Sequence, residues 1–234
     1  MEFFRSKTKP RGFTLIEMLC VISIISLLAA LLLPTLGRGK ARAFRIKCVH
    51  DLGQVGMAFH SFMNDHGSQF PMSVPTNAGG SLEFTEAGYQ VNGQFSFGYR
   101  HLQALSSEIS SPRILACPSD SRTAALRFSD LRNENVSYFV GIRADYSKPT
   151  SILAGDRNIT NNWPYPASLL HASLSTSTRW TGGLHQFKGN LLFADAHVEQ
   201  SKDLALSLPY ASLYECDIVL PSVASYTYAQ TPYS

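Results

Sequence analysis

Charged side chains are scarce in this sequence: they make up 16% of its 234 residues, against roughly 25% in an average soluble domain. Together with a hydrophobic content of 44%, this excludes an intrinsically disordered chain. The common signatures of catalytic and cofactor sites are also missing, since the sequence has no G-x-S-x-G, Walker loop, H-E-x-x-H, G-x-G-x-x-G or C-x-x-C. We therefore predict a protein that is not an enzyme.

The positive charge is confined to two short stretches. Residues 1–12 carry a net charge of +3 and residues 38–47 a net charge of +5, whereas everything from Cys48 onward sums to −4. The two basic stretches flank one apolar segment. A broad basic surface on the body of the protein is absent from this pattern, so nucleic acid is not expected as a partner.

The apolar segment, residues 13–33, contains one charged side chain, Glu17. As a helix it would span about 31 Å, close to the ~30 Å hydrocarbon core of a bilayer. A cleaved secretory signal needs an apolar core of only about 7–15 residues, so the run over residues 13–33 is longer than such a signal requires. A plain membrane anchor leaves Glu17 unexplained, because a carboxylate at membrane depth costs about 2.5–3.5 kcal/mol. Cleavage between Gly12 and Phe13 would create an α-amino group able to neutralise Glu17 of a neighbouring copy, which favours a polymer.

The residues around this point resemble a known motif. Arg11-Gly12-Phe13-Thr14-Leu15-Ile16-Glu17 is similar to the cleavage and methylation motif of type IV pilins and type II secretion pseudopilins. The resemblance implies that prepilin peptidase cuts after Gly12 and methylates the amine of Phe13, and that Glu17 acts in assembly. Pro34 matches the proline that bends the helix in those families.

Apolar residues continue at helical spacing beyond Pro34, at Ala41, Phe44, Cys48, Leu52, Val55, Phe59 and Phe62. We expect one helix over about 14–64 and strands at 136–140, 152–154 and 190–198. His60 and His66 are interpreted as solvent-facing. The predicted fold is α+β and pilin-like, with a long membrane-spanning helix packed on a small antiparallel sheet. Its expected parts are a leader (1–12), a transmembrane and polymerisation helix (13–33), an amphipathic continuation (34–66) and a head with long loops (67–234).

A second resemblance concerns the head. His185 and Asp195 are separated by nine residues, which is similar to the H-x9-D-G motif of a pilin-like family of Planctomycetes and Verrucomicrobia. Ala196 stands where that family has glycine, which suggests a different or slightly strained hairpin. Further stretches that fit the family are Cys48 with Asp51–Gly56, Cys117-Pro118-Ser119-Asp120, Ser137-Tyr138 and Gly155-Asp156-Arg157-Asn158.

The same region offers candidate metal ligands. Asp195 and His197 would share one face of a strand, and His185 or Asp156 would complete a site with nitrogen and oxygen donors. Structural hydrogen bonding and catalysis are the alternatives for these residues. The major pseudopilin of type II secretion holds calcium in a carboxy-terminal loop, so calcium is the divalent ion that the resemblance implies, although calcium prefers oxygen donors.

The chain has four cysteines, of which Cys20 lies in the apolar helix. The other three, Cys48, Cys117 and Cys216, would face an oxidising compartment, where a disulfide persists. Cys48–Cys117 is the preferred pair because it would tie the helix to the head. A Cys117–Cys216 pair and free thiols remain alternatives, since spacing does not fix connectivity.

Taken together, these features predict a structural subunit of a type II secretion pseudopilus or a type IV pilus-like filament. Its expected partners are prepilin peptidase, further copies of itself, other pseudopilins, an inner-membrane assembly platform and, before assembly, the lipid bilayer. The resemblance implies a single-pass protein of the bacterial inner membrane with its leader in the cytoplasm and its head in the periplasm. The alternatives are a minor, tip-located module that binds polysaccharide, DNA or a secreted substrate, and a membrane-tethered hydrolase, for which no nucleophile is evident.

Overall fold

The computed structural model describes residues 12–85, 90–91, 94–95, 97–160, 169–172, 178–201 and 216–221. The expected leader therefore lies outside the described residues, apart from Gly12. The chain divides into two compact units, residues 1–42 and 43–234, which are considered separately. A helix, α1 (Leu15–Asp65), begins in the first unit and ends in the second, within one residue of the bounds that the apolar spacing predicts. Pro34 lies inside α1 and does not end it.

The first unit presents its apolar side chains to the surroundings. Leu15, Ile22, Leu27 and Leu33 are each at least 60% exposed. By length and composition α1 could cross a membrane, and the exposed apolar surface of its first half is consistent with burial in lipid or against other subunits.

In the second unit, one face of α1 is buried in the head. The buried positions are Cys48, Asp51, Leu52, Val55, Gly56, Ala58, Phe59, Phe62 and Met63. They recur at steps of three and four, as expected of one helix face. Gly56 allows α1 to approach the side chain of Leu192 closely, because a Cβ at residue 56 would lie 2.7 Å from Cδ1 of Leu192. The amphipathic stripe predicted from the sequence is therefore the face that packs on the sheet.

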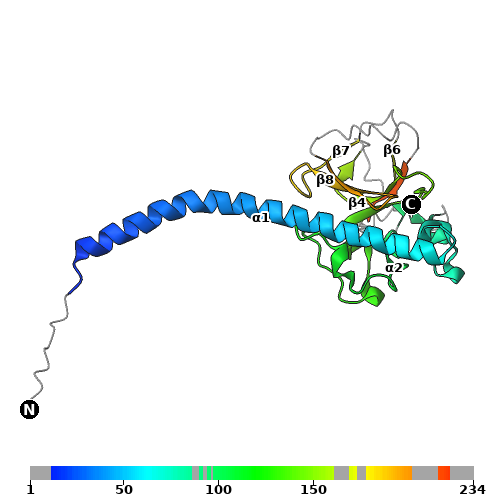
Figure 1. Ribbon diagram of the computed structural model, residues 1–234, viewed down its shortest axis with the longest axis horizontal. Coiled ribbons are helices and arrows are strands. Elements are labelled where there is room, and N and C mark those ends of the chain that lie inside the picture. The colour runs from blue at the N-terminus through cyan, green and yellow to red at the C-terminus, as the bar shows by residue number, and fades with distance from the viewer. Residues whose placement is uncertain are drawn as a thin grey trace, which may run out of the picture. The chain divides into compact units, whose positions relative to one another are not determined.

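Six of the described strands form one antiparallel sheet in the order β6-β10-β3-β4-β8-β9. Strands β4, β6 and β8 of this sheet are labelled in Figure 1. Their bounds are β3 (Tyr138–Gly141), β4 (Ile152–Asp156), β6 (Leu169–Ala172), β8 (Gly189–Phe193), β9 (Val198–Ser201) and β10 (Cys216–Val219). The helix followed by this sheet confirms the predicted α+β class. The strand expected over 190–198 is wrong as a single element, because it is a β8–β9 hairpin whose turn occupies residues 194–197.

The sheet carries apolar side chains on both faces. Tyr138, Val140 and Leu192 belong to the larger core, which includes the buried face of α1. A smaller cluster holds Phe139, Ile152, Ile159, Trp180, Leu191, Phe193 and Ile218. Neighbouring residues of β3 and β8 divide between the two clusters because successive side chains of a strand point to opposite faces. Both faces of the sheet are therefore covered.

Short helical turns are frequent among the described residues at the start of the head, for which long loops were expected. They are η1 (Pro71–Ser73), η2 (Thr76–Ala78), η3 (Leu82–Thr85) and the first residues of α2 (Tyr99–Gln103), with η5 (Pro112–Leu115), η6 (Phe128–Asp130) and η7 (Asn133–Asn135) further on. Two small ladders join β1 (Gln90–Val91) to β2 (Gln94–Phe95) and β5 (Ile159–Thr160) to β7 (Arg179–Trp180).

Candidate functional site

The start of α1 is closed by a reciprocal cap between Thr14 and Glu17. Oε2 of Glu17 accepts hydrogen bonds from the backbone nitrogen of Thr14 at 2.8 Å and from its hydroxyl at 2.7 Å. The Thr14 hydroxyl in turn accepts from the Glu17 backbone nitrogen at 3.3 Å. This is the capping-box arrangement of a T-x-x-E sequence. Glu17 thus has a partner within its own chain, which the sequence analysis missed, and the adjacent Phe13 is 67% exposed.

In the head, the short motifs quoted above meet in a buried polar network. The carboxylate of Asp120 accepts hydrogen bonds from Nε and Nη2 of Arg157, each at 2.7 Å, and from the Ser137 hydroxyl at 2.7 Å. Burial alone would raise the pKa of Asp120, but the hydrogen bonds from Arg157 and Ser137 outweigh it and hold the pKa below its usual value. Three motifs from distant parts of the sequence are therefore joined by one ionised carboxylate.

The neighbouring carboxylate, Asp156, lies at the end of β4 and is fully buried. Its Oδ2 accepts from the backbone nitrogen of Asn190 at 2.8 Å and from the Asn190 side chain at 2.9 Å. Nε2 of His185 lies 3.4 Å from the same oxygen. Burial raises the pKa of Asp156 to about 7, although the Asn190 hydrogen bonds and the charge of Arg45 oppose the shift. Burial, aided by Arg45, lowers the pKa of His185 to about 4, so this imidazole is neutral.

Asn158 shapes the segment that carries His185. Its Nδ2 donates to the backbone carbonyls of Thr181, Leu184 and Lys188 at 2.9–3.0 Å. Within this segment His185, Gln186 and Phe187 all have left-handed backbones, with φ of 48°, 54° and 62°. Such residues cost about 1–2 kcal/mol each and persist only where surrounding contacts require them. The Asn158 side chain supplies those contacts and fixes His185 beside Asp156.

Asp195 and His197 lie elsewhere, in the exposed turn between β8 and β9. Asp195 accepts hydrogen bonds from the backbone nitrogen of His197 and pairs with the His197 ring. The expectation that they share one strand face is wrong, because the chain turns there. Ala196 has a φ of 67°, so the departure from glycine does place alanine in a left-handed position.

The two histidines expected to face solvent both have partners. Nε2 of His60 lies 2.8 Å from the Ala194 carbonyl oxygen, against this turn. His66 contacts the carbonyls of Phe62 and Ala78. Neither histidine is the freely solvated side chain that the sequence suggested.

The four expected metal ligands therefore form two pairs, the buried His185–Asp156 and the exposed Asp195–His197. Within the described part of the chain, no group of three or more potential metal ligands contains more than one of the four. Asp156, Asp195 and His197 are thus not gathered at one point in this geometry, and a divalent ion held by either pair stays a prediction.

Cys48 and Cys117 form a disulfide with an S–S distance of 2.02 Å and a Cα–Cα distance of 5.4 Å. Of the three alternatives that the sequence left open, two pairings and free thiols, this is the preferred one. It joins the buried face of α1 to the Cys117–Asp120 motif. Nε2 of His185 lies 3.5 Å from Cys117 Sγ, so the disulfide adjoins the polar network. Cys20 is exposed on α1.

Two arginines that the sequence analysis did not single out also hold this region together. Arg45, from the basic stretch after the apolar segment, donates to the carbonyls of Ser201 at 2.6 Å and Gly189 at 3.2 Å. Arg45 thus contacts the head, although the charge pattern placed it only in the basic stretch that follows the apolar segment. Arg122 donates to the carbonyls of Asn133, Val136 and Pro221. Arginines that satisfy buried carbonyls leave no periodic signal in a sequence.

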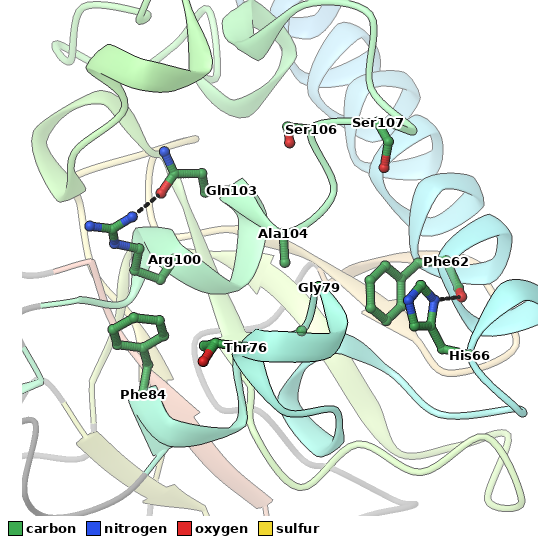
Figure 2. A pocket seen from close by; sticks show the side chains of 11 residues that line it. Phe62, His66, Thr76, Gly79, Phe84, Arg100, Gln103, Ala104, Ser106 and Ser107 are labelled. Atoms are coloured by element: carbon green, nitrogen blue, oxygen red, sulfur yellow. Dashed lines mark hydrogen bonds between the residues drawn. The ribbon is translucent and has the colours of Figure 1, made fainter.

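A separate hollow of about 600 Å³ opens beside the end of α1 and α2 (Figure 2). Phe62 and His66 stack on one side of it, with ring centroids 3.8 Å apart. Arg100 lies over the Phe84 ring on the other side and donates to Gln103 at 2.7 Å. The remaining lining is small or polar, from Thr76, Gly79, Gly80, Ala104, Ser106 and Ser107. The lining contains no acidic side chain.

Two comparisons with known proteins bear on this chain. Residues 7–33 match the prokaryotic N-terminal methylation motif. Over 89 residues, 35% of this chain, the sequence is 34% identical to the type II secretion system core protein G of Klebsiella pneumoniae. That alignment covers 64% of the relative, so this chain matches less than two thirds of its length. No solved structure matches the chain significantly.

Proposed function

We propose that this pseudopilin-like chain is a structural subunit of a type II secretion pseudopilus or a type IV pilus-like filament. The carrying observation is the methylation motif over residues 7–33, in which Glu17 follows the Gly12–Phe13 junction at the spacing expected of a prepilin. The distant homology to core protein G supports the same conclusion. Proteins of this kind are in general structural and not enzymatic.

In this proposal prepilin peptidase removes residues 1–12 and methylates the amine of Phe13. The apolar helix anchors the subunit in the bacterial inner membrane, with the head in the periplasm, until the assembly platform adds it to other copies or other pseudopilins. Glu17 then pairs with the Phe13 amine of a neighbour. Both intrachain hydrogen bonds that Glu17 accepts go to Oε2, and a carboxylate can accept at its second oxygen as well.

The first test is mass spectrometry of the amino-terminal peptide from membrane and sheared-surface fractions. A chain that starts at N-methyl-Phe13 in the sheared fraction supports a surface filament, and the same start confined to the membrane supports a short pseudopilus. A chain that still begins at Met1 would contradict the proposal.

The second test separates assembly from capping. Glu17→Ala should leave cleavage intact and reduce filament yield at least tenfold. Thr14→Ala removes the hydroxyl half of the reciprocal cap but keeps the carboxylate and its bond from the backbone nitrogen of residue 14, so it should retain most of the yield. Equal loss in the two variants would mean that Glu17 acts only by starting the helix.

The hollow in Figure 2 favours a second candidate, a minor subunit that binds a ligand at the filament tip. Its aromatic rings, hydroxyls and single arginine, without an acidic side chain, suit a polysaccharide better than a cationic ligand. Isothermal titration calorimetry of the detergent-solubilised chain with soluble acidic oligosaccharides tests whether the hollow binds such a ligand. Binding that Arg100→Gln weakens supports the candidate, and absence of binding removes it.

A further inference from the structure

Cys48, Cys117 and His185 bring three potential metal donors to one buried point of the head. Both sulfurs and a ring nitrogen of His185 lie within 4.8 Å of one another. The side chains are almost fully buried, with exposures of 0% for Cys48, 2% for Cys117 and 2% for His185. Two thiolates and an imidazole are a donor set that suits zinc, whereas calcium takes oxygen ligands.

The distances around His185 match the edges of a zinc tetrahedron. With Zn–S of about 2.3 Å and Zn–N or Zn–O of about 2.0–2.1 Å, tetrahedral ligands lie roughly 3.5 Å (S···N) and roughly 3.4 Å (N···O) apart. Nε2 of His185 lies 3.5 Å from Cys117 Sγ and 3.4 Å from Asp156 Oδ2. The S···N edge is therefore present before any metal is added, and His185 lies at the N···O distance from Asp156 through Oδ2, the oxygen that also binds Asn190.

Asp156 is the candidate for the fourth corner. Asp156 is not within 4.8 Å of both sulfurs, so its carboxylate has to turn toward them. Among the residues that the structure describes, its Oδ1 is buried without a hydrogen-bond partner, which leaves one oxygen uncommitted while Oδ2 binds Asn190. The positive charge of Arg45 acts on both Asp156 and His185, and it would balance the net negative charge of a site with two thiolates and one carboxylate.

We propose that the reduced form of this protein binds one Zn²⁺ through Cys48, Cys117 and His185, with Asp156 as the fourth ligand. A dithiol reductant transfers two electrons and two protons to the disulfide, giving two thiols, and is itself oxidised to a disulfide. Zn²⁺ then displaces the two thiol protons, and neutral His185 binds through Nε2. The metal-bound and disulfide-bonded states exclude each other, because both use the same two sulfurs. The site is thus open to a chain whose thiols are not yet oxidised, and closed afterwards.

The test uses the full chain in detergent with Cys20→Ser, which removes the exposed thiol. The protein is reduced with dithiothreitol, freed of it under anaerobic conditions and titrated with Co²⁺. The reduced form should show thiolate-to-cobalt charge transfer and the intense visible bands of tetrahedral Co²⁺, saturating at one equivalent, and Zn²⁺ should bleach both. The oxidised form should show neither.

Variants assign the ligands. Cys48→Ser and Cys117→Ser should each weaken Co²⁺ binding at least tenfold and reduce the charge-transfer intensity. His185→Gln should weaken it at least tenfold while both cysteines and the oxidised fold, checked by circular dichroism, remain. Asp156→Asn should shift the visible bands with a smaller loss. The matched control is His50→Gln, which lies on α1 near Cys48 but outside the site. Its Co²⁺ affinity and spectrum should equal those of the parent.

Three results would overturn the proposal. The first is reduced protein without a charge-transfer band at saturating Co²⁺. The second is His185→Gln with the affinity and spectrum of the parent. The third applies if reduction unfolds the head: Zn²⁺ must then restore its near-ultraviolet circular dichroism, and failure to do so counts against the site.

Discussion

Replacing Asp156 by asparagine should change how the stability of the head depends on pH. The side chain is fully buried, and Asn190 is its hydrogen-bond donor at Oδ2. Burial raises the pKa of Asp156 to about 7, whereas an unfolded chain has a value near 3.9. Between these values the folded protein keeps a proton that the unfolded chain releases. The contribution of Asp156 is therefore fully present below about pH 4 and is lost as the pH rises to about 7.

The size of this loss follows from the shift. About three pKa units at 1.36 kcal/mol each give about 4 kcal/mol between the two ends of the window. Asparagine does not titrate, so the free energy of unfolding of Asp156→Asn relative to the parent should improve by up to about this amount between pH 4 and pH 8. His185 has the opposite sign: burial and Arg45 lower its pKa to about 4, so its contribution is lost as the pH falls from about 6.5. Because Nε2 of His185 lies 3.4 Å from Asp156 Oδ2, this effect does not cancel by itself, and the comparison is repeated in a His185→Gln background.

Denaturant unfolding of the full chain in detergent, followed by near-ultraviolet circular dichroism at several pH values, measures the difference. Trp180, which is 1% exposed, lies in the core of the head and contributes to this signal. Asp130→Asn, at an exposed carboxylate, is the matched control and should differ from the parent by a constant amount. A difference between Asp156→Asn and the parent that stays flat from pH 4 to pH 8 would refute the reasoning.

Three further substitutions probe the packing of the head in the same unfolding assay. Ala196→Gly should stabilise by up to about 1 kcal/mol, because glycine adopts the φ of 67° without the cost that alanine bears; a loss of stability would show that the turn is not left-handed in solution. Gly141→Ala should cost about 3 kcal/mol or more, since its Cβ would stand 2.1 Å from the Ile152 carbonyl oxygen of the neighbouring strand, and a neutral result would contradict that close approach. Arg157→Ala should cost about 3–5 kcal/mol by leaving the buried Asp120 carboxylate unpaired, with Arg157→Lys recovering only part of the loss.

The helix could be predicted from the sequence because its signal is local and periodic. The apolar run and the three–four spacing that follows it predicted the bounds of α1 to within one residue, and Pro34 did not mislead because a single proline within a long helix need not end it. The α+β class followed from the helix and the strands after it.

The hairpin and the polar network were harder to predict for two different reasons. The run from Asn190 to Val198 reads as one apolar strand, and the turn inside it depends on a left-handed Ala196, which carries no turn signal of the kind that glycine gives. The grouping of Asp120 with Arg157, and of Asp156 with His185, depends on contacts between residues 29–37 positions apart in the sequence. Motif resemblance singled out these residues, but not which of them would touch.

The cross-link between Cys48 and Cys117 also has a mechanical meaning. It closes a loop with a sequence separation of 69 residues, and each residue of an extended chain adds about 3.4 Å. A molecule stretched from its two ends would therefore lengthen by about 230 Å less with the bond intact than with it reduced. If these subunits carry load along a filament, tension on the second half of α1 reaches the Cys117–Asp120 segment of the head through a covalent bond, and the head resists being peeled from its helix even after its noncovalent contacts have yielded.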